Sequence, residues 1–280
     1  MTRRFLASRL AVVGLALAAA LTTVAIFAPL ITPHDPTAQF EGGISPLGLP
    51  LGPNGHFLLG TDTLGRDMES RLIYGARISL LIGTLANGLA VAIGVTLGAV
   101  GGFFGRAAET IVMRLTDVMM AFPLILLLIA LAVVLQPSVG IIIIVIALGG
   151  WPGTARLIYG EVVALKEREF IQAARAVGAS NLGILVRHIL PHLYAPLIVW
   201  TMLGIAPAIT TESVLSFLGV GVQPPTPSWG NMIGEGQANY LSAPWLVLWP
   251  GIALMLTVVS FNLVGDGLRD VLDVNQSPRG

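Results

Sequence analysis

The 280-residue sequence contains no cysteine, which excludes disulfide frameworks and thiolate metal sites. Charged side chains are also scarce, at 11% of residues, whereas ordinary soluble domains carry about 25%. The 15 basic and 15 acidic residues cancel, so no excess of positive charge indicates nucleic acid as a partner. A soluble globular domain is therefore a poor description of this chain.

Recognisable catalytic patterns are absent as well. The chain has no HExxH, no GxSxG and no GxxxxGK[ST] sequence, so it offers neither a familiar catalytic set nor that ATP-binding loop. The four histidines, His34, His56, His188 and His192, fall in segments expected on opposite sides of a membrane. We therefore expect no metal or cofactor on this chain, and the alternative of a membrane enzyme is disfavoured.

Long apolar runs are what the chain has instead. Hydrophobic residues make up 55% of it, and its mean hydropathy is +0.84. Crossing a hydrocarbon core of about 30 Å takes roughly 20 apolar residues in a helix. Six runs satisfy this length: Leu10–Ile31, Ile78–Phe103, Leu115–Leu135, Val139–Ile158, Ala195–Phe217 and Trp245–Leu268. The sequence predicts an all-α integral membrane protein with six transmembrane helices.

The first run has an alternative interpretation as a secretory signal, because Arg3, Arg4 and Arg9 precede it. The pair Arg3-Arg4 followed by Phe5 and Leu6 faintly resembles a twin-arginine signal. The apolar run is about 22 residues long, however, and signal cores run to about 7–15. We therefore interpret it as a transmembrane helix.

Basic residues indicate the direction of the crossings, since short cytoplasmic loops are enriched in Lys and Arg. If the N-terminus is inside, the outside keeps three of them: Arg66, Arg71 and Arg77. The inside then holds twelve: Arg3, Arg4, Arg9, Arg106, Arg114, Arg156, Lys166, Arg168, Arg175, Arg187, Arg269 and Arg279. This bias predicts that both termini are cytoplasmic.

Two segments are expected outside. Residues Thr32–Arg77 begin proline-rich and then show helical spacing of Met68, Leu72, Ile73 and Ala76, which predicts a short amphipathic helix on the outer surface. Residues Gly219–Gly236 form a Pro- and Gly-rich loop that could dip toward the membrane. We accordingly divide the chain into residues 1–77, with the first helix and the external segment, and residues 78–280, with five helices.

Three features within the spans bear on packing and transport. Gly94, Gly98 and Gly102 form a small-residue ridge suited to close helix packing. Pro123 and Pro207 are expected to kink their helices. Glu212 is the ionisable residue expected deepest in the membrane, so it is a candidate either for the translocation path or for an internal pair.

A polar, helix-forming stretch separates the fourth and fifth runs. Residues Gln172–Pro191, QAARAVGASNLGILVRHILP, are here called the elbow. Phe170, Ala174 and Val177 recur at helical spacing and predict an apolar stripe, while Ala173 and Ala174 leave room for a partner surface. The pattern indicates two short helices on the cytoplasmic side that a partner protein can grip.

Capping residues define where these two helices meet. Gly178 suits a left-handed C-cap of the first helix, and Ser180 suits the N-cap of the second. One apolar face is then expected on the second helix, and it comprises Leu182, Leu185, Val186, Ile189, Leu190 and Leu193. Force on the first helix would reach the fifth span through this second helix.

The elbow resembles the cytoplasmic loop signature of ABC importer permeases, EAA, three residues, G, nine residues, I, any residue, LP. Ala173, Ala174, Gly178, Leu190 and Pro191 match it with the spacing intact. Gln172 replaces the leading Glu, and His188 occupies the Ile position. The first departure puts a salt bridge to an ATPase at this residue in doubt.

Three further segments resemble the C-type permease subunit of the dipeptide, oligopeptide and nickel group. They are GTDTLGRDMESRLIYGARISL from Gly60, DVMMAFPLILLLI from Asp117 and ESVLSFLGVGVQPPTPSWGNMI from Glu212. Four separated motifs in the same order make this resemblance specific. It implies the type I ABC importer permease fold, with a coupling loop over about residues 159–194.

The resemblance also implies partners and a place in the cell. A B-type permease, two cytoplasmic ATPases that bind ATP and Mg²⁺, and an external solute-binding protein would assemble with this chain in a bacterial or archaeal plasma (inner) membrane. Di- or oligopeptides are the expected solute, and nickel chelates, glutathione or another small solute are alternatives. A secondary transporter is disfavoured because neither coupling-ion residues at mid-membrane nor an inverted repeat is evident.

The resemblance makes the external face the receiver of the binding protein. Trp229 and the Pro224-Pro225 pair are candidates for docking it. The alternative is a loop that seals the bundle, since prolines and a tryptophan at a membrane interface are ordinary anchors.

Overall fold

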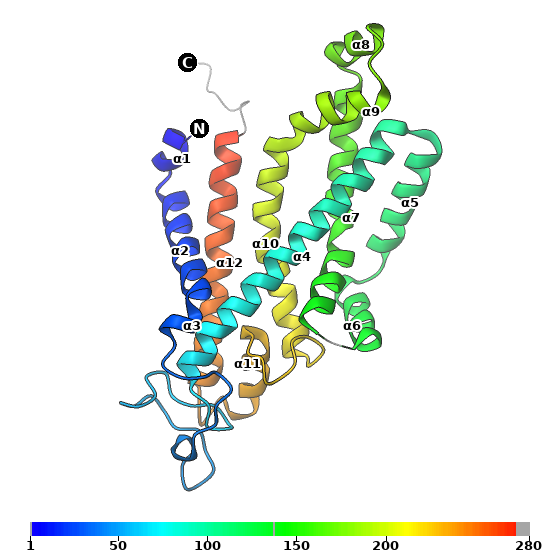
Figure 1. Cartoon of the computed structure of the whole chain (residues 1–280). Coiled ribbons are helices and arrows are strands. Elements are labelled where there is room, and N and C mark those ends of the chain that lie inside the picture. The colour runs from blue at the N-terminus through cyan, green and yellow to red at the C-terminus, as the bar shows by residue number, and fades with distance from the viewer. Residues whose placement is uncertain (1, 137, 273–280) are drawn as a thin grey trace.

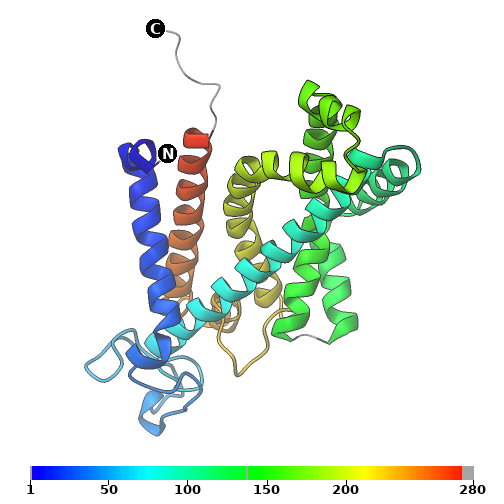
Figure 2. The same cartoon turned by 45° about the horizontal axis from the view of Figure 1, so that its top comes forward.

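The computed structural model describes residues 2–136 and 138–272, so Arg279 of the predicted inside set lies outside the described residues. Over these residues the chain is helical, without strands; isolated β-bridges occur only in the segment before α4. Figures 1 and 2 show the helices side by side in a bundle, with an irregular segment at one end and two short helices protruding at the other.

Within the described residues, five helical runs are long and apolar enough to cross a membrane. They are α2 (Arg9–Ile26), α4 (Met68–Phe104), α7 (Val139–Lys166), the run Asn181–Phe217 that contains α10 (Tyr194–Phe217), and α12 (Trp245–Leu272). Helices α5 (Arg106–Ala121) and α6 (Leu124–Leu135) are together long and apolar enough for a sixth, broken span or for a re-entrant loop. The all-α fold is confirmed, with five candidate crossings or six if α5 and α6 form one broken span.

The third crossing bends far more than a proline kink requires. Helices α5 and α6 meet at 92°, at a break that contains Phe122 and Pro123. Phe122 has an extended backbone (φ −84°, ψ 138°), the conformation preferred before a proline. Pro207, by contrast, lies inside α10, which continues through it.

Helix α4 begins at Met68, well before the apolar run that starts at Ile78. Asp67 caps it by accepting hydrogen bonds from the backbone N–H groups of Glu69 and Ser70. The expected short external helix is therefore the first part of α4, and the division between residues 77 and 78 falls inside one continuous helix. The apolar run starts only at Ile78 because the first turns of α4 carry polar side chains.

The glycine ridge of α4 packs against α7. A Cβ atom at Gly94 would lie 2.5 Å from Thr154 Cβ, and one at Gly102 would lie 2.9 Å from Val162 Cβ. At Gly98 the same Cβ would collide with the α7 backbone. The ridge therefore allows α4 and α7 of the same chain to pack closely against each other.

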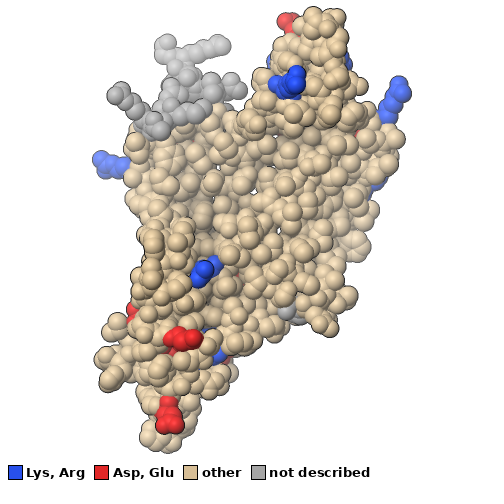
Figure 3. Space-filling view, in the orientation of Figure 1, with Lys and Arg blue, Asp and Glu red and all other residues tan. Residues whose placement is uncertain are grey.

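The remaining elements lie at the two ends. Short helices α1 (Thr2–Ala7), α8 (Glu169–Ala176) and α9 (Asn181–Ile184) and the end of α12 share one end. The other end holds α3 (Ala28–Ile31), η1 (Glu41–Gly43), α11 (Trp229–Gly236) and η4 (Gln237–Asn239). Figure 3 shows few charged side chains along the flank between these ends.

The segment between α3 and α4 is folded onto the bundle. His34, Phe40 and Phe57 form an aromatic cluster with ring centroids 4.9–5.9 Å apart. Trp245 of α12 donates from Nε1 to the carbonyl oxygen of Thr61 at 3.1 Å. This segment therefore joins α4 and α12 at the end of the bundle opposite the elbow.

Candidate functional site

The elbow is built between α7 and α10. Helix α7 extends to Lys166, whose Nζ donates to the carbonyl oxygen of Gly102 at the end of α4 (3.1 Å). The segment that joins α7 to α10 therefore comprises residues 167–193, and the name elbow is used for all of it from here on. The wider coupling loop, over about residues 159–194, stays a prediction. The elbow contains α8, α9, a π-helical turn at Leu185–Ile189 and a 3₁₀ turn at Leu190–Leu193.

The turn between α8 and α9 has the predicted caps. Gly178 adopts φ +84°, in the left-handed region that favours glycine. Its N–H donates to Arg175 O at 3.0 Å, and Ala179 N–H donates to Ala174 O at 3.0 Å, which closes the end of α8. Ser180 caps α9 by accepting from Gly183 N–H at 3.2 Å. Both local predictions are confirmed.

One side of the elbow is packed against the bundle. Ile171 and Ala174 of α8 belong to a buried cluster. The other buried members come from α4, α7 and the second half of the elbow: Ala99, Phe103, Ile158, Val162, Ile184, Leu185, Ile189 and Leu193. Ala174 is only 9% exposed, so the expected partner-facing stripe of Phe170, Ala174 and Val177 is wrong at Ala174. That residue packs inside its own chain.

The opposite side presents apolar side chains to solvent. The exposed fraction is 40% for Phe170, 85% for Val177, 65% for Leu182 and 51% for Val186. Leu182 and Val186 therefore do not share the buried face on which they were predicted, because Ile184, Leu185 and Ile189 occupy it. Gln172 and Ala173 are also exposed. We call these six residues the elbow surface.

The second half of the elbow leads directly into α10. From Asn181 to Phe217 the chain is one helical run, and Figure 2 shows it turning from the elbow into the span. Leu190 is half-buried and Pro191 is exposed at the 3₁₀ turn within this run. The ring of His192 stacks on Phe170 with centroids 4.9 Å apart. Phe170 at the start of α8 therefore contacts the turn that leads directly into α10.

Glu212 lies inside α10 and is fully buried. Its carboxylate accepts hydrogen bonds from the hydroxyls of Ser79 (3.0 Å), Ser213 (3.4 Å) and Ser216 (2.7 Å). Ser79 belongs to α4, so the carboxylate joins two spans. Of the two expected roles, this arrangement favours the internal one, with hydroxyls in place of a cationic partner. A role in the translocation path stays a prediction.

Trp229 is not available for docking. It is the first residue of α11, its side chain is 1% exposed, and its Nε1 donates to Leu72 O of α4 at 3.1 Å. The expected docking role is therefore wrong for this side chain, which seals the bundle as the alternative proposed. Pro224 and Pro225 are exposed, and their role in docking stays a prediction.

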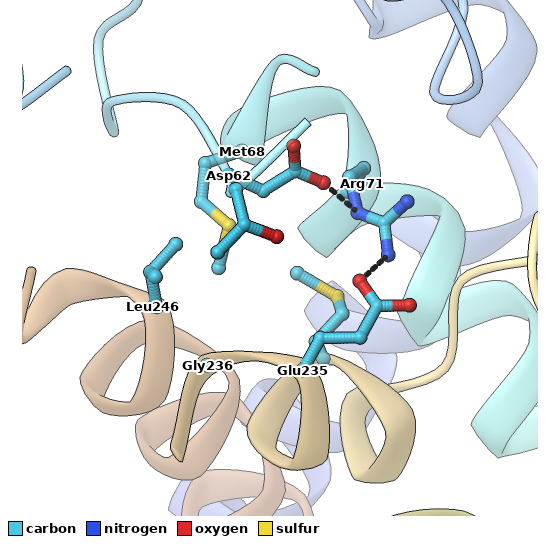
Figure 4. A pocket seen from close by; sticks show the side chains of 8 residues that line it. Asp62, Met68, Arg71, Glu235, Gly236 and Leu246 are labelled. Carbon is cyan, nitrogen blue, oxygen red and sulfur yellow. Dashed lines mark hydrogen bonds and ion pairs between the residues drawn. The ribbon is translucent and has the colours of Figure 1, made fainter. Parts of the chain in front are cut away.

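A charged cluster that sequence reasoning missed lies next to α11 (Figure 4). Arg66 contacts Asp62 at 2.5 Å and Glu235 at 2.7 Å, and Arg71 contacts the same two carboxylates at 3.3 Å and 2.8 Å. Both arginines are buried. Arg71 Nη1 has no hydrogen-bond partner among the described residues, and its Nε pairs with Asp62 without hydrogen-bond alignment. The cluster fastens α11 to the start of α4.

A partly open cavity of about 270 Å³ lies between α4, α6, α7 and α10. Its polar lining is neutral and consists of Asn87, Thr154, Trp200 and Thr211. Asn87 donates to Thr201 O at 2.8 Å, and Trp200 Nε1 donates to Thr154 Oγ1 at 2.9 Å. Glu212 is not among the lining residues. We call this space the membrane cavity.

A bundle of five or six candidate crossings, with a protruding elbow and a cavity between its helices, is the architecture expected of a membrane permease. Comparison with known families agrees. Residues 94–276 match the model described as "Binding-protein-dependent transport system inner membrane component", and residues 1–47 match "N-terminal TM domain of oligopeptide transport permease C". The chain belongs to this family of ABC importer permeases, as a C-type subunit. The family prediction is confirmed.

Three relatives show how far the similarity extends. The dipeptide transport system permease protein DppC of Alkalihalophilus pseudofirmus is 43% identical over 95% of this chain and 86% of its own. The glutathione transport system permease protein GsiD of Escherichia coli is 42% identical over 97% and 88%. The di/tripeptide transport system permease protein DppC of Pseudomonas aeruginosa is 42% identical over 89% and 82%. The similarity therefore covers nearly the whole chain.

Proposed function

We propose that this chain is the C-type permease subunit of an ATP-driven importer of di- or oligopeptides. In this role it makes the passage through the membrane and carries out no covalent chemistry. Separate ATPase subunits would bind ATP and Mg²⁺ and hydrolyse the nucleotide. Their closure would shift the bundle between inward and outward access, because the two conformations make different contacts.

The observation that carries this proposal is the elbow surface. Its apolar side chains are exposed on helices that are themselves anchored to α4 and α7 by the buried cluster around Ile171. An exposed apolar patch on a rigid support is typical of a protein interaction site. Because the same segment continues into α10, a partner bound there can move a transmembrane helix.

We infer that the elbow, α1 and the end of α12 face the cytoplasm. They share one end of the bundle, so one assignment fixes all three. The twelve-to-three bias of basic residues supports the inside assignment. A reporter fused after Ser180 should behave as cytoplasmic and one fused after Gly236 as external. The reverse pattern would overturn the orientation and the location of the elbow.

The same reasoning gives the other partners. A B-type permease and the membrane lipid would cover the apolar flank, which exposes Leu85, Leu126 and Met255 among other large side chains. Two cytoplasmic ATPases would bind the elbows of the two permeases. An external solute-binding protein would dock at the end that holds α11, with Pro224 and Pro225 as candidate contacts. The whole assembly would lie in a bacterial or archaeal plasma (inner) membrane.

The proposed solute rests on the relatives. Two of the three are named for dipeptides or di/tripeptides, and the third is named for glutathione, itself a short peptide. Glutathione import is therefore the second candidate. Nickel chelates remain an alternative only through the resemblance of the sequence.

The test is uptake by the complete transporter reconstituted in vesicles with its binding protein and ATPases. Labelled dialanine should accumulate in an ATP-dependent manner, and unlabelled dialanine should compete. Accumulation of glutathione without that of dialanine would select the second candidate. ATP-independent exchange of either solute would indicate a secondary transporter and contradict the proposal.

A further inference from the structure

A second cavity, of about 470 Å³ and also partly open, lies between the elbow-side ends of α7, α10 and α12. It shares two lining residues, Trp200 and Leu203, with the membrane cavity. These two side chains therefore separate two adjoining spaces. We call the second space the vestibule.

The two cavities follow one another in depth. Glu161, in the vestibule, lies about 8 Å before the end of α7, and Trp200 lies about 9 Å from the start of α10. Thr211, in the membrane cavity, lies about 26 Å from that start. The two spaces thus lie one after the other from the middle of the bundle toward its elbow-side end, with Trp200 lining both.

The vestibule differs from the membrane cavity in charge. Its charged lining residues are Glu161 of α7 and Arg269 of α12, whereas no charged residue lines the membrane cavity. Both side chains are exposed, and no ion pair joins them to each other among the described residues. A carboxylate and a guanidinium therefore stand apart on different walls of one cavity.

We propose that the vestibule is an exit site for a zwitterionic short peptide. Glu161 would bind the terminal ammonium and Arg269 the terminal carboxylate, for which its two parallel N–H groups are suited. The vestibule volume falls within the roughly 300–1,000 Å³ usual for small-molecule sites. This inference rests on the proposed function, since it names the two side chains that would recognise the transported peptide.

Charge complementarity distinguishes this occupant from others. An apolar helix or a lipid chain filling the vestibule would remove both charges from water without pairing them, which is costly. A peptide with free termini supplies one partner for each charge. The membrane cavity, lined only by neutral groups, would hold the same solute weakly and let it pass.

The absence of cysteine from this chain provides a direct test. Val199→Cys places a single thiol in the vestibule, and Ile198→Cys places one on the neighbouring residue, which is 47% exposed and lines neither cavity. The complete nucleotide-free transporter is treated with a neutral, water-soluble maleimide with and without dialanine. Labelling is read on this chain by mass spectrometry.

We expect dialanine to slow labelling of Val199→Cys and to leave Ile198→Cys unchanged. In the Val199→Cys background, Glu161→Gln or Arg269→Gln should weaken the apparent affinity for dialanine about tenfold, as expected for the loss of a charge-assisted hydrogen bond. The control Asp270→Asn removes an exposed charge beside Arg269 that does not line the vestibule, and it should have no effect. Dialanine amide, which lacks the carboxylate, should protect poorly.

Three results would overturn the inference. Protection that survives both charge substitutions would show that neither side chain contacts the peptide. Failure of Val199→Cys to react without dialanine would show that a partner subunit fills the vestibule. Dialanine uptake by the unmodified transporter distinguishes failure of the exit site from failure of the proposed function. Uptake without protection refutes the exit site alone, whereas absent uptake refutes the proposed function.

Discussion

The backbone at Gly178 offers the sharpest test of the elbow. Its φ of +84° lies in the region where an L side chain is strained, yet a Cβ atom there would meet nothing within 4 Å. Substitution therefore costs backbone strain without a clash inside the chain. The strain is about 1–2 kcal/mol for an ordinary residue and is greatest for a β-branched one. Because about 1.4 kcal/mol is tenfold, Gly178→Val should reduce the native elbow population by about 5- to 30-fold or more.

A series of substitutions separates strain from contact with the ATPase. If strain dominates, uptake should fall in the order Gly178→Asn, Gly178→Ala, Gly178→Val, because Asn tolerates the left-handed region best. If instead a partner surface lies against Gly178, Asn should be as damaging as Val. The assays are peptide uptake and co-purification of the ATPases, with membrane insertion of this chain as the control. Normal uptake and normal co-purification of Gly178→Val would refute the coupling role of this turn.

Substitutions at four further positions test the other assignments. Gln172→Glu should change ATPase co-purification little, since an exposed charge contributes roughly 0–1 kcal/mol. Ala174→Asp should detach the ATPases, because a charge at this buried position unfolds the elbow. The opposite pattern would show that we have assigned the wrong face of the elbow to the ATPase contact. Glu212→Leu should destabilise the chain by about 1–3 kcal/mol because it leaves serine hydroxyls unpaired, and Glu212→Gln should cost less. Full stability with altered solute affinity would favour a role in the translocation path instead. Trp229→Ala should cost about 3 kcal/mol of packing, so it should lower both assembly and the stimulation of ATPase activity by the binding protein. Trp229→Phe should be milder. Loss of stimulation with normal assembly would restore a docking role.

Local chemistry accounts for what could be predicted from the sequence. Run length identified the five long apolar helices and the bent pair α5–α6, because a bilayer imposes a minimum number of apolar residues. Gly178 and Ser180 gave the turn of the elbow correctly, since a left-handed residue and an N-cap have narrow residue preferences. The Pro123 break was foreseen only as a kink. How far two helices diverge at such a break depends on what each packs against, and α5 is held to α7 by Arg156–Asp117 and Tyr159–Glu109 contacts.

The direction in which a side chain faces was the least predictable property of the elbow. Both Ala174 and Val177 fit an apolar stripe by spacing, but one is buried and the other is 85% exposed. An eight-residue helix that packs on one side presents the next row of side chains to solvent, and two rows of a short helix look alike in sequence. Packing against Ile184 and Ile189, which lie in the second half of the elbow, determines which of the two rows is buried.

The charged cluster at the far end shows why long-range pairing escaped the sequence. Arg71 and Glu235 are separated by 164 positions, and each alone resembles an ordinary loop charge near a membrane surface. Arg71 was expected among the outside basic residues as an ordinary surface charge, but its burial at 1% exposure follows only from the return of α11 to the start of α4. A buried arginine without its carboxylates is costly, so the cluster makes the position of α11 and the fold of residues 62–71 depend on each other. A permease that opens at this end must either keep these ion pairs and move α11 with α4, or break them and expose both arginines to water.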